Sequence, residues 1–234
     1  MNQTMKLALR LFLLALAAYS AVLLAVEWST SQDYVRHYFS DIEDGRPFFA
    51  VNTTLSTFLL LSSALLLVFG ALSGRKESAK GAHLFAWCQS GMFAFLAFDD
   101  RFQLHEALAY KIGIADHFIM MGWAIVQVAI LALLARPASI PVRSAGYFIA
   151  GVVLFAVMMV FDALMPHDME MRLSLEDLTK AWATAMFFFS AWFFARFQIG
   201  LDPDEKTLGQ FLRWIVTGER TWAMPAPRTA KADR

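Results

Sequence analysis

Six apolar segments, each about 20 residues long, constrain this chain more than any other feature of its sequence. About 20 helical residues rise about 30 Å, which is the thickness of the hydrocarbon core of a bilayer. The alternation of apolar and polar residues typical of a membrane β-strand is missing from these segments. We therefore predict an all-α, polytopic membrane bundle of six transmembrane helices, over residues 9–27, 53–73, 83–104, 117–135, 146–165 and 178–197.

The composition agrees with this class of protein. Of the 234 residues, 58% are hydrophobic and 17% are charged, whereas a soluble domain is about half apolar and about a quarter charged. The net charge is zero, so we expect membrane lipids and no nucleic acid as partners. The single cysteine, Cys88, excludes an intrachain disulfide framework and a CxxC metal site.

The charged residues between the segments predict the orientation. Acidic segments (27–46, 99–116 and 162–177) alternate with short cationic ones, such as Lys6 with Arg10 and Arg136 with Arg143. The positive-inside rule then places both termini in the cytoplasm and the acidic segments outside. The first apolar run continues through Val26, which is longer than the apolar part of a usual signal peptide and favours a retained first helix. We predict a multi-pass protein of a bacterial inner membrane.

The domain organisation follows from the same segments. Residues 1–200 form the predicted transmembrane domain. Residues 201–222 have apolar side chains at helical spacing and predict an amphipathic cytoplasmic helix, and residues 223–234 predict a disordered tail. The aromatic stretch 28–50 predicts a short surface helix that directs His37 toward the outer ends of the other helices.

The stretch FLAFDDRFQLHEAL, residues 95–108, raises the question of function. It follows a long apolar run, and five helices place an ionisable group at this depth, about 17–19 residues from their inner cations. No helix breaker precedes Gly113, so a continuous helix is expected. It would align Asp99, Gln103, Glu106 and Tyr110 on one face and place Arg101 with His105 on another.

Imidazole and carboxylate groups alternate in the outer segments. His105, His117 and His167 each lie beside an acidic residue. This combination suits zinc or non-haem iron, and it also suits general acid–base catalysis or a proton relay. We predict a site with His105, His117, His167 and Asp100 as metal ligands and with Asp99, Asp100, Glu106 and Asp162 as catalytic carboxylates.

A structural interpretation competes with this one. Polar residues begin at every membrane boundary, which alone gives them a common depth. Asp99, Asp100 and Asp162 have apolar flanks and cost a few kcal/mol unless they are paired or face a wet cavity. Both a functional cavity and an ion pair such as Arg101 with Asp162 satisfy that requirement. Ser174 with Asp177 predicts a helix N-cap, which explains Asp177 without function.

The string DDRFQLHE, residues 99–106, resembles the D[DE]xxxxHE motif of a group of bacterial multi-pass membrane proteins. The chain is also loosely similar to membrane hydrolases of the alkaline ceramidase type, which hold zinc in a helical bundle through three His, an Asp and a Ser. That resemblance implies that Asp100, His105, His117 and His167 supply part of such a set. The chain departs from it in having six rather than seven predicted helices and no HxxxH pair on the last one.

Two functions from different classes are compatible with the sequence. The first is a metal-dependent membrane hydrolase, in which a metal-bound water attacks an ester or amide of a lipid-like substrate. The second is a non-catalytic protein, either an accessory subunit of a membrane protein partner or a small proton-coupled carrier. Neither a GxGxxG nor a P-loop string is present, so nucleotide chemistry is not expected.

Overall fold

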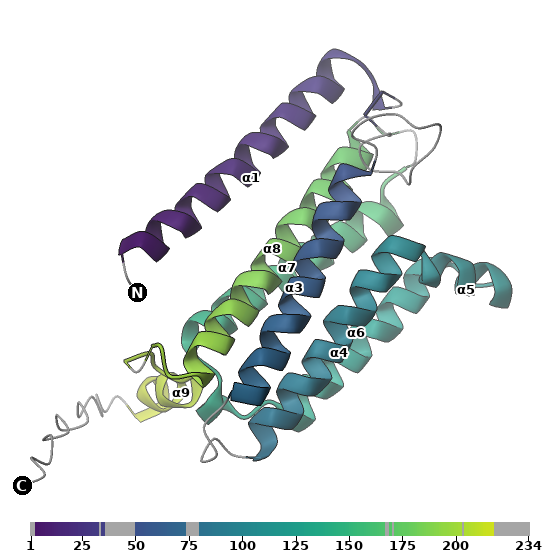
Figure 1. The fold of residues 1–234 in the computed structure, drawn as a ribbon. Helices are drawn as coiled ribbons and strands as arrows, with labels where there is room; N and C mark the ends of the chain where they lie inside the picture. The colour runs from purple at the N-terminus through teal and green to yellow at the C-terminus, as the bar shows by residue number, and fades with distance from the viewer. Residues whose placement is uncertain are drawn as a thin grey trace, which may run out of the picture.

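The structure is a computed structural model, and it describes residues 3–32, 34–35, 50–73, 80–166, 169, 171–202 and 204–217. The long helices run side by side as a bundle, with α1 along one flank and the short α5 projecting from one end (Figure 1). The predicted surface helix around His37 and the tail 223–234 lie outside the described residues. The helices are α1 (Gln3–Ser29), α3 (Val51–Ser73), α4 (Lys80–Phe102), α5 (Leu104–Ile112), α6 (Asp116–Leu134), the 3₁₀ turn η1 (Pro137–Ser139), α7 (Val142–Leu164), α8 (Arg172–Gln198) and α9 (Leu208–Thr217).

The prediction of an all-helical fold is confirmed for the described residues, and four helices are long and apolar enough to cross a membrane. They are Leu9–Ser29, Val51–Ser73, Asp116–Leu134 and Val142–Asp162. The other two predicted segments correspond to α4 and α8, which have 23 and 27 residues. These two helices carry more charged side chains than the four apolar ones. Most of α8 is buried against its neighbours, whereas α4 has an exposed face that includes Leu84, Trp87 and Phe98.

The main core joins α3, α4 and α8. Leu60 and Leu67 of α3 pack with Phe93 of α4 and with Phe187 and Phe194 of α8. Small residues bring the helices close together: Ala86 and Ala97 of α4 and Ala183 of α8 are completely buried. This packing fixes the positions of α3, α4 and α8 relative to one another. It therefore also fixes the relative positions of the polar side chains at their neighbouring ends.

A close contact between α7 and α8 completes the bundle. Ser144 and Ser190 each donate a hydrogen bond of 2.9 Å to the other residue's backbone carbonyl. Two turns after Ser144 on α7, Gly151 faces Phe187 of α8. The Phe187 ring also contacts the rings of Phe93 and Phe148. A Cβ atom on Gly151 would lie 2.6 Å from Cε1 of Phe187 and 3.2 Å from the carbonyl oxygen of Ala183.

We expect Gly151→Ala to lower the free energy of unfolding by about 1–3 kcal/mol, because the added methyl group would overlap the Phe187 ring and crowd the Ala183 carbonyl oxygen, so that the ring has to shift. Gly146→Ala on the same helix is the matched control, since among the described residues nothing lies within 4 Å of its added Cβ. Thermal unfolding of the two variants in detergent gives the comparison. Equal stability of both variants would contradict the close packing of α7 on α8.

The prediction of one continuous helix through residue 112 is wrong. Helix α4 ends at Phe102, and Gln103 adopts a left-handed conformation with φ of 51° before α5 begins. The reason is the carboxylate of Asp99, whose Oδ1 accepts the backbone N–H of His105 at 2.7 Å. This side chain replaces the helical carbonyl acceptor and caps the new helix. The predicted face of Asp99, Gln103, Glu106 and Tyr110 is therefore broken.

The predicted amphipathic segment 201–222 contains α9. Thr207 and Gln210 form a capping box at its start, in which the Gln210 side chain accepts the N–H of Thr207 at 3.0 Å and the Thr207 hydroxyl accepts the N–H of Gln210 at 3.3 Å. Leu208 packs against the main core, whereas Ile215 and Val216 are 59% and 83% exposed. The helix thus presents an apolar face outside the bundle, at the end remote from α5 (Figure 1).

Candidate functional site

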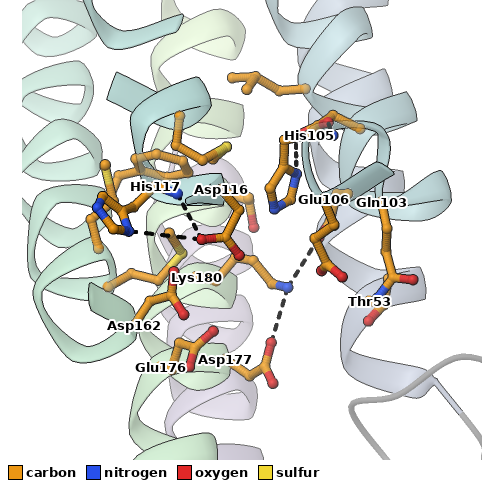
Figure 2. A pocket seen from close by; sticks show the side chains of 18 of the residues that line it. Thr53, Gln103, His105, Glu106, Asp116, His117, Asp162, Glu176, Asp177 and Lys180 are labelled. Carbon is orange, nitrogen blue, oxygen red and sulfur yellow. Dashed lines mark hydrogen bonds and ion pairs between the residues drawn. The ribbon is translucent and has the colours of Figure 1, made fainter. Parts of the chain in front are cut away.

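A polar cavity of about 250 Å³ opens at the end of the bundle where α4 ends and α6 begins (Figure 2). Helices α3 and α8 enter at this end and α7 leaves there, so six helices contribute to its walls. Carboxylates outnumber cations in the lining. The polar lining residues are Thr53, Asp99, Asp100, Gln103, His105, Glu106, Asp116, His117, Asp162, Glu176, Asp177, Lys180 and Thr184.

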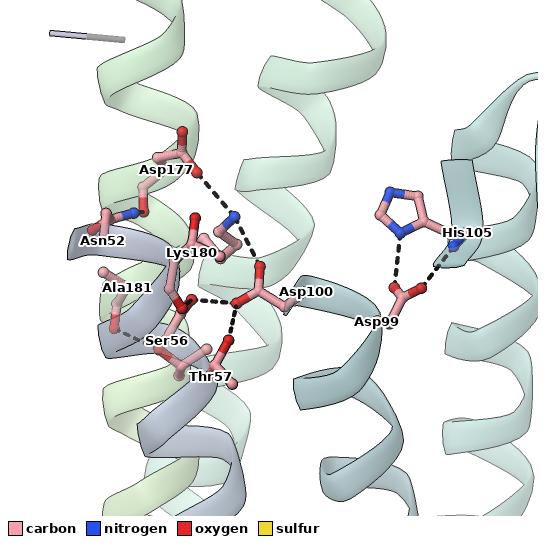
Figure 3. A network of polar contacts seen from close by, with 11 residues as sticks. Asn52, Ser56, Thr57, Asp99, Asp100, His105, Asp177, Lys180 and Ala181 are labelled. Atoms are coloured by element: carbon pink, nitrogen blue, oxygen red, sulfur yellow. Dashed lines mark hydrogen bonds and ion pairs between the residues drawn. The ribbon is translucent and has the colours of Figure 1, made fainter. Parts of the chain in front are cut away.

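Asp99 and His105 form the best-defined pair in this cavity. Asp99 is 2% exposed, and its Oδ2 lies 2.8 Å from Nδ1 of His105 (Figure 3). The same carboxylate holds the backbone N–H of His105 through Oδ1. Both oxygens of one buried group therefore fix the position and the ring orientation of the histidine, and Nε2 is the ring nitrogen left for a reactant.

The surroundings shift the pKa values of His105 and Glu106. Burial lowers the pKa of His105, but the hydrogen bond and charge of Asp99, together with the charges of Glu106 and Asp116, outweigh burial and raise it above its ordinary value. Burial raises the pKa of Glu106, and the neighbouring carboxylates add to that effect while His105 opposes it. Below its pKa the His105 imidazolium can donate a proton, and above its pKa the Glu106 carboxylate can accept one.

We expect Asp99→Asn to lower the pKa of His105 by about one unit or more, because the variant removes the adjacent negative charge and keeps an oxygen that can cap α5. NMR titration of the histidine ring protons in detergent micelles measures this shift. Asp116→Asn is the control, and its effect should be smaller because Asp116 contributes the last of the opposing charges. An unchanged pKa in Asp99→Asn would contradict the pair.

A second network links three helices behind the first pair. Nζ of Lys180 lies 3.0 Å from Oδ1 of Asp100 and 2.9 Å from Oδ1 of Asp177. The hydroxyls of Ser56 and Thr57 donate to the other oxygen of Asp100, which ties α3 to α4 (Figure 3). One ammonium thus joins two carboxylates from α4 and α8, and the lining keeps an excess negative charge.

Asp162 has a different partner from the one that the sequence suggested. Arg172, which is 7% exposed, donates to the carboxylate of Asp162 at 3.2 Å and to its backbone carbonyl at 3.0 Å. Arg172 also lies 3.5 Å from Glu176. This arginine joins the end of α7 to the start of α8, so Asp162 has a structural role in addition to its place in the cavity wall.

Most of the predicted site residues meet in this one cavity. Asp99, Asp100, His105, Glu106, His117 and Asp162 all line it, and His167 lies outside the described residues. The backbone N–H of His117 donates to the carboxylate of the adjacent residue, Asp116, at 2.7 Å. Within the described part of the chain, no group of three or more His, Cys, Asp and Glu residues is arranged to hold a metal ion. Zinc or non-haem iron therefore stays a prediction.

The sequence interpretation missed Lys180 and misassigned Asp177. Helix α8 begins at Arg172, two residues before Ser174, and the Ser174 hydroxyl caps nothing in the described structure. Asp177 lies in the second turn and pairs with Lys180. The signal that could have found Lys180 is its position as the lone cation in the apolar run before Arg196, three residues after an aspartate.

Comparisons with known proteins give one match. A family model described as Domain of unknown function (DUF8692) matches residues 7–195, which include every residue that lines the cavity. No curated protein and no solved structure matches the chain.

Proposed function

The chain belongs to the DUF8692 family, and we propose that it is a membrane hydrolase that cleaves an ester or amide bond of a lipid-like substrate by general acid–base catalysis. The observation that carries this proposal is the Asp99–His105 pair beside Glu106 in a cavity between membrane-length helices. An imidazole that a buried carboxylate orients and a neighbouring carboxylate of raised pKa are the two groups that hydrolysis needs.

The roles follow from the protonation states. Glu106 in its ionised form takes a proton from water, and the water oxygen forms a bond to the substrate carbonyl carbon. The tetrahedral intermediate then breaks its C–O or C–N bond as Nε2 of the His105 imidazolium protonates the leaving group. Transfer of the proton from Glu106 to His105 restores the starting state. Asp99 stabilises the imidazolium through its hydrogen bond and its charge.

The same proposal includes the topology of the chain. We propose six crossings, with α4 and α8 added to the four apolar helices, and with both termini in the cytoplasm of a bacterial inner membrane. The lengths of α4 and α8 support this number, because 23 and 27 residues rise about 35–40 Å. The alternation of cationic and acidic segments supports the orientation, which puts the cavity at the outer side.

A proton-coupled carrier is the second candidate function. The Asp100–Lys180–Asp177 network favours it, since carboxylates that share one ammonium change partners when one of them takes a proton. A carrier would move protons with its cargo across liposomes and would leave ester and amide bonds intact. Hydrolysis and proton flux are therefore separate readouts of the two candidates.

The test is turnover of lipid esters and amides by the purified protein across a range of pH. We expect a bell-shaped profile of kcat. Activity falls on the acid side as Glu106 takes a proton, at a pH above the ordinary carboxyl pKa, and falls on the alkaline side as His105 loses its proton, above the ordinary imidazole pKa.

Absence of turnover together with pH-driven flux in liposomes would replace the hydrolase with the carrier. Elemental analysis of the same preparation tests whether the hydrolase depends on a metal. A metal that is bound to the original protein and lost from a His105→Ala/Glu106→Ala variant would support a metal-dependent hydrolase.

A further inference from the structure

An apolar groove adjoins the polar cavity and continues along the bundle. It encloses about 170 Å³ between α4, α6 and α7, with Phe187 of α8 at its base. Its walls consist of aliphatic, aromatic and thioether side chains apart from the Gln127 amide, which is paired with Gln89 through hydrogen bonds of 2.9 and 3.2 Å. A surface of this chemistry binds hydrocarbon and gives a charged group no partner.

The groove and the polar cavity lie directly next to each other. Five residues line both of them, namely Leu96, Met120, Phe155, Met159 and Phe187. A molecule that fills the two together has a polar group near His105 and Glu106 and an apolar part beside Trp123 and Val152. A molecule with a polar group at one end and an apolar chain at the other is an amphiphile.

The groove also opens sideways. Helix α6, which the structure describes in full, has no buried residue. Val128 and Val152, which line the groove from α6 and α7, are 63% and 42% exposed. In a bilayer this side faces lipid, so a chain can enter from the membrane without passing through water.

The length of the groove limits the chain that it holds. The lining residues of α6 run from Met120 to Leu131, and 11 helical steps rise about 16 Å. An extended chain advances about 1.2 Å per bond, so this distance holds about 12–14 carbons.

We infer that the substrate is a single-chain amphiphile, whose hydrocarbon chain of about 12–14 carbons lies in the groove between α6 and α7 and whose polar head lies in the cavity with His105 and Glu106. The inference rests on the proposed function for the cleavage of the bond and on the groove alone for the binding of the chain. The groove thereby places a bond near the head group, at the junction marked by Met120 and Phe155, next to the acid–base pair.

The experiment measures chain binding without turnover. The probes are monoacylglycerols of increasing chain length that carry bromine on the chain, because bromine in contact with an indole quenches its fluorescence. In nanodiscs we expect quenching to strengthen with chain length up to about 14 carbons and then to level off. Trp123→Phe should remove the chain-dependent part of the quenching, since Trp123 lines the groove.

Ala124→Phe fills the groove from α6 and should weaken binding of the longest effective chain at least tenfold, with shorter chains affected less. The matched control is Val126→Phe, which lies on the same helix, is 42% exposed and is outside the groove lining. Equal effects of the two variants, or quenching that ignores chain length, would overturn the inference and identify the groove contents as surrounding bilayer lipid.

The two proposals fail in different ways. Quenching that depends on chain length, without any hydrolysis, would support the groove as a chain-binding site and would contradict the proposed hydrolase activity. A rate of hydrolysis that changes neither with chain length nor in Ala124→Phe would support the hydrolase activity and would contradict chain binding in the groove.

Discussion

Replacing Glu106 by Gln is expected to lower kcat for hydrolysis by about 10²–10⁴-fold, which is the usual contribution of a general acid or base. Gln has nearly the same size and keeps a carbonyl oxygen in the cavity, but it has no charge with which to accept a proton from water. Because chain binding depends on the groove and not on this carboxylate, we expect KM to change little. Turnover and bromine quenching of the same preparation separate the two effects.

Controls for this variant come from the same short helix. Tyr110 of α5 is 92% exposed, and Tyr110→Phe should leave kcat within about twofold of the original protein. His105→Gln should lower kcat by a similar factor to Glu106→Gln, and the double variant should lose little more, since the effects of an acid and a base that work as one catalytic unit are not additive. Retention of kcat within tenfold in Glu106→Gln would remove Glu106 from the proposed mechanism.

The location of the site could be predicted from the sequence, because membrane insertion acts on local composition. The six-crossing prediction puts Asp99, His117 and Asp162 at the ends of their apolar segments and therefore at one common depth. The structure places all three in one cavity. The Gln127 amide pairs with Gln89 of a neighbouring helix, in agreement with the general need of a lone amide among apolar side chains for a partner.

The partners could not be predicted, because they depend on which helices are neighbours. Helix α8 packs along α3 as well as along α7, and α4 packs on the same α3, and this arrangement brings Lys180 to Asp100. The break at Gln103 has a similar cause. The break depends on the Asp99 carboxylate, which accepts the backbone N–H of His105 six residues later. Helix propensities of single residues do not predict such a hydrogen bond.

Replacing Lys180 by Met is expected to lower the free energy of unfolding by about 3–5 kcal/mol, since the variant leaves two buried carboxylates without their common cation. The Asp100 and Asp177 side chains are 10% and 8% exposed, so water compensates little for the lost ammonium. Met fills most of the volume of the Lys stem, and the loss therefore reports charge rather than a cavity. Chemical unfolding in mixed micelles measures it.

The charge interpretation predicts a pattern among further variants. Lys180→Met with Asp100→Asn leaves only Asp177 unpaired and should recover part of the stability, and addition of Asp177→Asn should recover most of it, because the triple variant buries no charge in this network. A wild-type-like stability of Lys180→Met alone, within about 1 kcal/mol, would mean that water solvates the two carboxylates. In that case the network is a part of the open cavity, and Lys180 is free to serve the substrate rather than the fold.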